Sequence, residues 1–103
     1  MMYNYYCFET DSAWDICAVR TFLEEHGLCS ADGYSYDNKA PFISLSLLYL
    51  KGEGGWNSER DRDERLCNYI PAVTSDISDS DPFVQELLHD LSGYLHVPLR
   101  EDW

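Results

Sequence analysis

The residues that could perform nucleophilic or acid–base chemistry are few and scattered in this 103-residue chain. Nucleophilic catalysis needs a serine or cysteine beside a histidine that a carboxylate orients. The three histidines are His26, His89 and His96, and no Gly-x-Ser-x-Gly turn is present to expose a nucleophile. We expect His26, near the end of an expected helix, to interact with free backbone carbonyls. The sequence therefore predicts no catalytic residue, and an enzyme is the least favoured class.

Metal and cofactor signatures are equally weak. The four cysteines, Cys7, Cys17, Cys29 and Cys67, form no Cys-x-x-Cys pair, and a zinc site normally needs closely spaced ligand pairs. The spacing of His26 and Cys29 is the one candidate pair. Free cysteines are often small core residues, and we expect this of Cys7, Cys17 and Cys67. The sequence predicts no metal site and no cofactor.

Two further runs resemble ligand loops without meeting their requirements. The glycine-rich run at 52–55 lacks the Gly-Lys-Ser/Thr ending of a phosphate loop. Asp76, Asp79 and Asp81 lack the glycine and the bidentate glutamate of a calcium loop. We interpret these aspartates as solvated acids at a helix N-terminus, where the helix dipole favours them.

Charge is the most informative property of the composition. The chain has 19 acidic and 7 basic residues, a formal net charge of −12 and a pI near 4.3. This balance argues against a nucleic-acid binder, because binding to phosphates needs a surplus of lysine and arginine. Residues 1–38 hold seven acids and one base, residues 39–75 five of each, and residues 76–103 seven acids and one base. The excess lies in the two parts of the chain that carry the expected helices.

Alternation and capping signals place the first expected strand and helix. Residues 2–9 are rich in Tyr and Phe, which favour strands; Tyr3, Tyr5 and Cys7 would point to one face, and Asn4, Tyr6 and Phe8 to the other. We expect a helix to follow, capped by Ser12 with Asp15 three residues later in a capping box. Gly27 is a natural left-handed stop, after which Leu28 packs back on Leu23.

The middle of the chain predicts a loop and then a hairpin. Turn residues mark residues 30–41 as a loop, and apolar side chains alternate along a strand at 42–51. Residues 66–73 form the next expected strand, in which Pro71 indicates a sheet edge or a bulge. Between these strands, residues 52–65 form a polar, charged hairpin tip; a short helix capped by Ser58 is the alternative.

Helical spacing returns near the C-terminus. Asp81 and Pro82 form a typical helix start, as cap and first helical residue. Gly93 weakens the last turn or ends the helix. Residues 96–99 form an optional final strand and residues 100–103 a tail. The apolar stripe of this helix consists of Val84, Leu87, Leu88, Leu91, Tyr94 and Leu95.

These elements predict an α+β fold in a single domain, residues 1–103. A three- or four-stranded antiparallel sheet with both helices on one face satisfies their order, and a real final strand makes the topology ferredoxin-like. The longest apolar stretch, residues 41–50, is too short to cross a bilayer, and the N-terminus resembles no leader. We therefore expect a cytoplasmic protein that binds no membrane.

The helical acids suggest a partner. If both helices cover one sheet face, their outer sides form a single negative surface that attracts a basic protein. The functional hypothesis is a non-catalytic interaction protein that binds and neutralises such a partner, as an immunity or inhibitor protein does. The charge could alternatively serve solubility alone. The predicted contact residues are Asp15, Glu24, Glu25, Glu86 and Asp90, with Trp56 as an aromatic anchor.

A dimeric module that binds a small ligand between the sheet and the helices is the alternative function. Its mark would be an apolar pocket with a few convergent polar groups. The sheet face turned away from the helices carries several tyrosines and is a candidate surface for a homodimer. Trp56 and Trp103 could both be interface anchors. Alternatively, Trp56 folds back over the sheet edge and Trp103 docks the tail.

Overall fold

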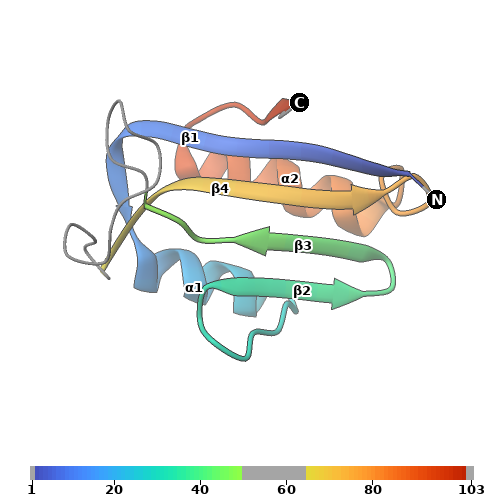
Figure 1. The fold of residues 1–103 in the computed structure, drawn as a ribbon, viewed down its shortest axis with the longest axis horizontal. Helices are drawn as coiled ribbons and strands as arrows, with labels where there is room; N and C mark the ends of the chain where they lie inside the picture. Colours follow the sequence, from blue (N-terminus) through green and yellow to red (C-terminus); the bar gives the residue numbers. More distant parts are fainter. Residues whose placement is uncertain (1, 50–64, 102–103) are drawn as a thin grey trace.

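A computed structural model describes residues 2–49 and 65–101 as one antiparallel five-stranded sheet with two helices. The strands lie in the order β2-β3-β4-β1-β5, and both helices lie on the same face of the sheet (Figure 1). The predicted α+β class is confirmed, with five strands instead of three or four. The elements are β1 (Tyr3–Asp15), α1 (Ile16–Glu25), β2 (Ser35–Lys39), β3 (Phe42–Ser46), β4 (Leu66–Ser75), α2 (Pro82–Leu95) and β5 (Arg100–Glu101).

The first strand is longer than the sequence predicted, and the helix begins later. β1 continues to Asp15, so the predicted helix start at Ser12 is wrong. After an irregularity that follows Glu9, Trp14 and Asp15 resume pairing with the start of β4. The indole N–H of Trp14 also donates to the carbonyl of Leu95, at 3.3 Å. These tertiary contacts outweigh the local capping box, and Asp15 itself caps α1.

The end of α1 is the one that the sequence predicted. Gly27 has a φ of 91°, and its N–H donates to the carbonyl of Glu24. The N–H of Leu28 donates to the carbonyl of Leu23 at 3.1 Å, and both leucine side chains are buried. This is the Schellman pair of hydrogen bonds with its apolar contact.

β2 lies within the segment that the sequence marked as a loop. Its residues pair with β3 from Ser35↔Ser46 to Lys39↔Phe42. Only Tyr36 of this edge strand is buried, so the strand has no apolar alternation to reveal it. The predicted turn before β2 is present, since the Asp32 carboxylate accepts the N–H groups of Tyr34 and Ser35. Because β2 is an edge strand, most of its side chains face solvent, and polar residues are sufficient there.

Pro71 does not mark a sheet edge, because β4 lies between β3 and β1. The pairing of β3 with β4 lapses after Leu45↔Ala72 and resumes in the same register at the bridge Leu48↔Tyr69. The lapse coincides with Pro71, which has no N–H to donate. The predicted pairing of these two strands is confirmed, whereas the hairpin tip at 52–65 falls on residues outside the described ranges, apart from Arg65.

α2 begins as predicted and ends later than Gly93. The Asp81 carboxylate accepts the N–H of Phe83 at 2.9 Å, and Pro82 occupies the first turn. The helix continues to Leu95, and His96 adopts a left-handed conformation after it. The final strand is β5, paired with β1, so its predicted position at 96–99 is wrong and the expected tail begins as a strand. Of the predicted stripe, only Tyr94 is not buried; it is 44% exposed.

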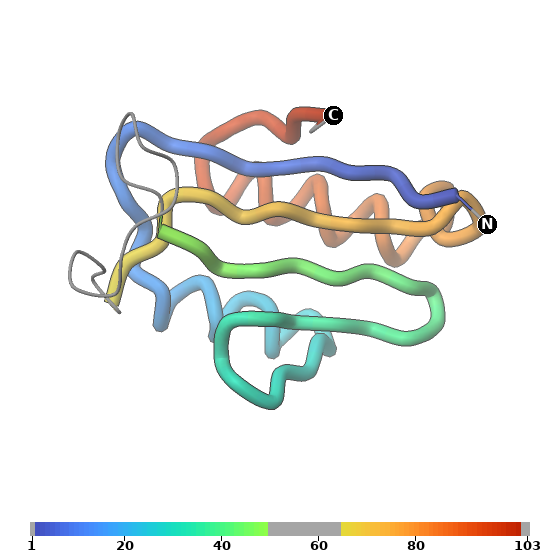
Figure 2. Tube along the Cα trace, viewed as in Figure 1, coloured from blue at the N-terminus to red at the C-terminus, as the bar shows by residue number. Residues whose placement is uncertain are grey.

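Figure 2 shows both helices on one side of the sheet, and the hydrophobic core is formed by side chains of the helices and of the strands. From the strands it includes Phe8 of β1, Ile43 and Leu45 of β3, and Ile70 of β4. Cys7 and Cys67 are buried as expected, but Cys17 is exposed because it lies on the solvent side of α1. Within the described residues, neither helix is long and apolar enough to cross a bilayer.

Candidate functional site

The predicted acidic contact residues are exposed on or beside the two helices. Glu24 and Glu25 form the last turn of α1, and Glu86 and Asp90 lie one turn apart on α2. Asp15 lies at the opposite end of α1, roughly 15 Å from the glutamates by the rise of a ten-residue helix. The structure therefore separates Asp15 from the other acids. Trp56 is not among the residues that the structure describes.

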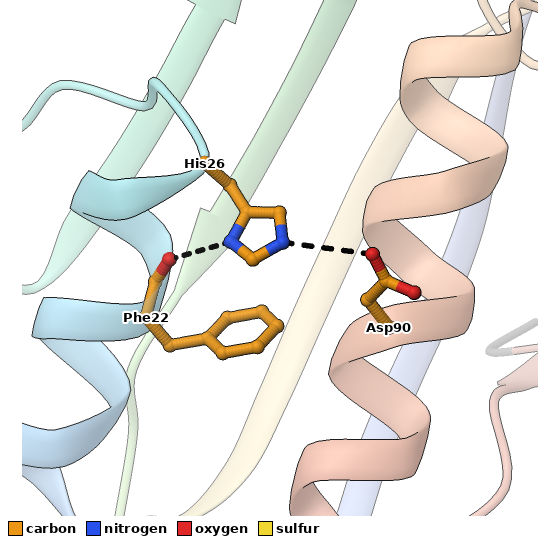
Figure 3. Close-up of polar contacts among 3 residues, drawn as sticks. All are labelled: Phe22, His26 and Asp90. Carbon is orange, nitrogen blue, oxygen red and sulfur yellow. Dashed lines mark hydrogen bonds and ion pairs between the residues drawn. The ribbon is translucent and has the colours of Figure 1, made fainter.

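The two helices lie side by side and contact each other through aromatic rings. The ring of Phe22 stacks on His26 at 4.2 Å and on Tyr94 of α2 at 4.7 Å between centroids. His26 also contacts Asp90 of α2 (Figure 3). Successive turns of α1, at Phe22 and His26, thus meet successively earlier turns of α2, so the helices run antiparallel. This contact joins their outer sides into one helical face.

Both ring nitrogens of His26 make contacts: Nδ1 contacts Phe22 of α1 and Nε2 contacts Asp90 of α2 (Figure 3). Its Nδ1 lies 2.8 Å from the carbonyl oxygen of Phe22, which can only accept, so Nδ1 carries the hydrogen. The contact with free carbonyls that the sequence predicted is present. Nε2 lies 3.6 Å from Oδ2 of Asp90, and this pair is attractive only when the ring is doubly protonated. With a neutral ring, the Asp90 carboxylate has no cationic partner within the described chain.

The glutamates at the end of α1 oppose the helix dipole. α1 has two glutamates in its last turn, where the dipole is already negative, and no basic residue stands in the last turn of either helix. Such acids weaken a helix by tenths of a kcal/mol. They also add to the negative electrostatic potential at the C-terminal end of α1, so a partner that approaches this end experiences a stronger field.

Arg20 is the one lysine or arginine on the helices, and it is engaged elsewhere. Its Nε donates to the carbonyl of Gly33 at 2.7 Å, and its guanidinium lies over the ring of Tyr34 at 5.0 Å. The side chain therefore holds the loop before β2. It leaves the acids of the helical face without a neutralising arginine.

No family model, curated protein or solved structure matches the chain.

A second polar cluster lies on the other flank of α2, and the sequence interpretation of its aspartate was wrong. Oδ1 of Asp79 accepts the hydroxyl hydrogens of Tyr6, at 2.8 Å, and Thr74, at 2.9 Å. Asp79 is therefore half-buried and bonded, not a solvated acid. Burial, followed by the hydrogen bond to Asp79, raises the pKa of Tyr6 to about 12. Tyr6 and Asp79 lie 73 positions apart, and no local spacing links them.

Glu24 and Tyr36 form a similar pair on the β2 side of α1. The Tyr36 hydroxyl donates to Oε2 of Glu24 at 2.9 Å. Burial and this hydrogen bond raise the pKa of Tyr36 to about 12. Glu24 thus has a structural contact besides its exposure, whereas no hydrogen bond or ion pair engages Glu25 or Glu86 within the described residues.

The described residues contain no group of three His, Cys, Asp or Glu side chains that could hold a metal ion. The opposite sheet face carries Tyr3 and Tyr5, each 45% exposed, beside Val73 and Ser75 of β4. Tyr3 also contacts the ring of Phe42 edge-on at 5.9 Å. Two exposed surfaces are therefore candidates for binding a partner: the acidic helical face and the half-apolar sheet face.

Proposed function

We propose that this chain is a non-catalytic interaction protein that binds and neutralises a basic protein through the helical face formed by α1 and α2. The observation that carries the proposal is the junction of the helices, where His26, which follows Glu25 at the negative end of α1, contacts Asp90 of α2 (Figure 3). A surface of one sign accelerates encounter with a partner of the opposite sign.

The arrangement also supports a mechanism of occlusion. Asp90 is 53% exposed, so a lysine or arginine of a partner can reach its carboxylate. Tyr94, exposed beside it and stacked on Phe22, offers an aromatic surface for a cationic side chain. A partner held by several such contacts would have its own basic site covered by the helices.

Charge-neutralising variants test the helical face. Glu25→Gln, Glu86→Gln and Asp90→Asn, combined, leave the Asp15 cap and the Glu24–Tyr36 bond intact. The matched control removes three exposed acids away from the helices: Asp11→Asn, Asp37→Asn and Asp76→Asn. Each protein is used to capture partners from host lysate at about 0.1 M and about 1 M salt, with quantification by mass spectrometry.

We expect the native protein and the control to capture the same basic proteins at low salt and to lose them at high salt. The helical variant should bind them about tenfold more weakly, since each exposed charge pair contributes roughly 0.2–1 kcal/mol. Equal capture by the helical variant and the control would show that general acidity, not this face, selects the partner.

A dimeric module that binds a small ligand is the second candidate function. Two features support it: the exposed tyrosines of the sheet face and a pocket of about 330 Å³ between α2 and the sheet. Sedimentation equilibrium tests the dimer, with Tyr5→Ser as the variant expected to be monomeric. A native protein that sediments as a monomer at all concentrations would remove the dimer from this proposal.

We further infer that the sheet is a split βαβ arrangement extended by β2. With β2 set aside, the order is β3-β4-β1-β5. β1 and β3, the core strands on either side of α1 in the chain, are then separated by β4, as in ferredoxin-like sheets. This interpretation supports the second candidate, because such a sheet presents one face to helices and the other to a partner.

A further inference from the structure

The pocket between α2 and the β1–β5 edge of the sheet combines an apolar wall with one carboxylate. Its volume is about 330 Å³, at the small end of the range for ligand sites. Leu88 of α2 and Leu99 supply apolar surface, whereas Tyr6, Asp79 and His89 supply polar groups. The pocket uses the flank of α2 opposite to the one that contacts α1.

Asp79 is held in a fixed orientation with half of its carboxylate unused. Its Oδ1 accepts both the Tyr6 and the Thr74 hydroxyl hydrogens, whereas Oδ2 has no partner among the described residues. The ion pairs within those residues are His26–Asp90 and Arg100–Glu9, so none reaches Asp79. The two hydroxyl hydrogen bonds offset part of the cost of withdrawing this carboxylate from water, and a cation beside Oδ2 would stabilise it further.

We propose that this pocket binds a small organic cation, whose ammonium group pairs with Asp79 and whose carbon chain lies against Leu88 and Leu99. The inference rests on the second candidate function and names the ligand class for its pocket. It does not depend on the helical face.

Charge selects a cation over other ligands. Tyr6 keeps its hydrogen at neutral pH, since even the ordinary tyrosine pKa of 10.0 lies well above 7, and it donates that hydrogen to Asp79. The hydroxyls of Tyr6 and Thr74 therefore fix the orientation of the carboxylate of Asp79, a residue that lines the pocket. The net charge of −12 repels anions and concentrates cations near the surface. An alkylammonium group has three N–H donors and can direct one to the carboxylate and the others to water, whereas a metal ion needs more ligands than the described residues place together.

A matched set of probes tests both the site and the ligand class. Hexylammonium, hexanol and hexanoate share a carbon chain and differ in the charge of the head group. Each is titrated into the native full chain while the amide signals of Leu88, His89 and Leu99 are followed by NMR. The test variant is Asp79→Asn, in which the amide oxygen can still accept the hydroxyls of Tyr6 and Thr74. The control is Asp76→Asn, which removes the same charge from an exposed residue outside the pocket.

Hexylammonium should shift these signals saturably, and Asp79→Asn should weaken its binding about tenfold or more, as expected for the loss of a hydrogen bond to a charged group. Asp76→Asn should leave the affinity unchanged.

Equal binding of hexanol or hexanoate would overturn the cation class and leave the pocket as a ligand site. If none of the three probes binds, both the cation class and the pocket as a ligand site are wrong. If Asp76→Asn loses as much affinity for hexylammonium as Asp79→Asn does, general electrostatic attraction explains the binding and the site is wrong. Urea unfolding of Asp79→Asn shows whether this variant is folded. If it is not, Tyr6→Phe replaces it: this variant keeps the carboxylate and the Thr74 bond to Oδ1 and removes the Tyr6 bond. A changed affinity for hexylammonium in Tyr6→Phe supports the proposal, and an unchanged affinity contradicts it.

Discussion

At the scale of single residues, Asp15 shows that a carboxylate predicted for recognition has a local structural role. Its side chain accepts the N–H of Cys17 at 2.9 Å, and its backbone is extended, as an N-cap requires. We expect Asp15→Ala to lower the free energy of unfolding by about 1 kcal/mol. Ser12→Ala should change it by less than about 0.5 kcal/mol, because Ser12 is exposed within β1. Urea unfolding followed by circular dichroism measures both.

Asp15→Asn is the conservative control, because asparagine caps a helix as well as aspartate does. It should keep the stability of the native protein while it removes the charge. If Ser12→Ala were the more costly change, the helix in solution would begin at Ser12, and the continuation of β1 to Asp15 would be wrong.

At the scale of elements, two glycines with different backbone conformations should respond in opposite ways to the same substitution. Gly27 has a φ of 91° after α1, where a side chain is strained. Gly93 lies within α2, and nothing lies within 4 Å of the position that a Cβ would occupy. We expect Gly27→Ala to lower the free energy of unfolding by about 1 kcal/mol and Gly93→Ala to raise it by about 0.5–1 kcal/mol.

Thermal unfolding of the two variants beside the native protein provides the measurement. Opposite shifts of the melting temperature, of a few degrees each, are expected for a domain of this size. A loss of stability in Gly93→Ala would mean that α2 ends near Gly93, as the sequence alone allowed, and not at Leu95.

The difference between local signals and contacts between distant residues explains which elements could be predicted from the sequence. The end of α1 and the start of α2 depend on nearby residues, such as Gly27 and the Asp81–Pro82 pair, and both were predicted. The length of β1 depends on Trp14 pairing with Cys67 and bonding to Leu95, and β2 depends on its neighbour β3. Contacts between distant residues decide these strands, so a local pattern could not reveal them.

At the scale of the whole molecule, the position of both helices on one face of the sheet decides how much of the candidate site could be predicted. The predicted position of both helices on one face of the sheet is confirmed, and buried and partly exposed side chains alternate along β3 accordingly. The acids of α1 and α2 could be assigned to the outer side by helical spacing. The contacts of His26 with Asp90 and of Tyr6 with Asp79 could not, because they require the docking of elements far apart in the chain.

The folded molecule as a whole should lose stability at alkaline pH through its buried hydroxyl and thiol groups. Tyr6 and Tyr36 each donate to a carboxylate, and burial raises the pKa of each from 10.0 to about 12. Because the folded-state pKa lies above the unfolded one, each contribution is complete below pH 10 and is lost as the pH rises through about 12. Burial also raises the pKa of Cys67 from 9.0 to about 12, so its contribution begins to fall at pH 9.

Urea unfolding at about pH 8 and about pH 11.5 should therefore show a marked fall in the free energy of unfolding. The double variant Tyr6→Phe/Tyr36→Phe is the control: it starts less stable at pH 8 but should fall less steeply, since only Cys67 of these three groups still titrates. The ionised tyrosines would otherwise place new charges beside Asp79 and Glu24, in a molecule of net charge −12. Parallel falls in the native protein and the double variant would show that general charge repulsion, and not these two hydroxyls, governs the alkaline limit.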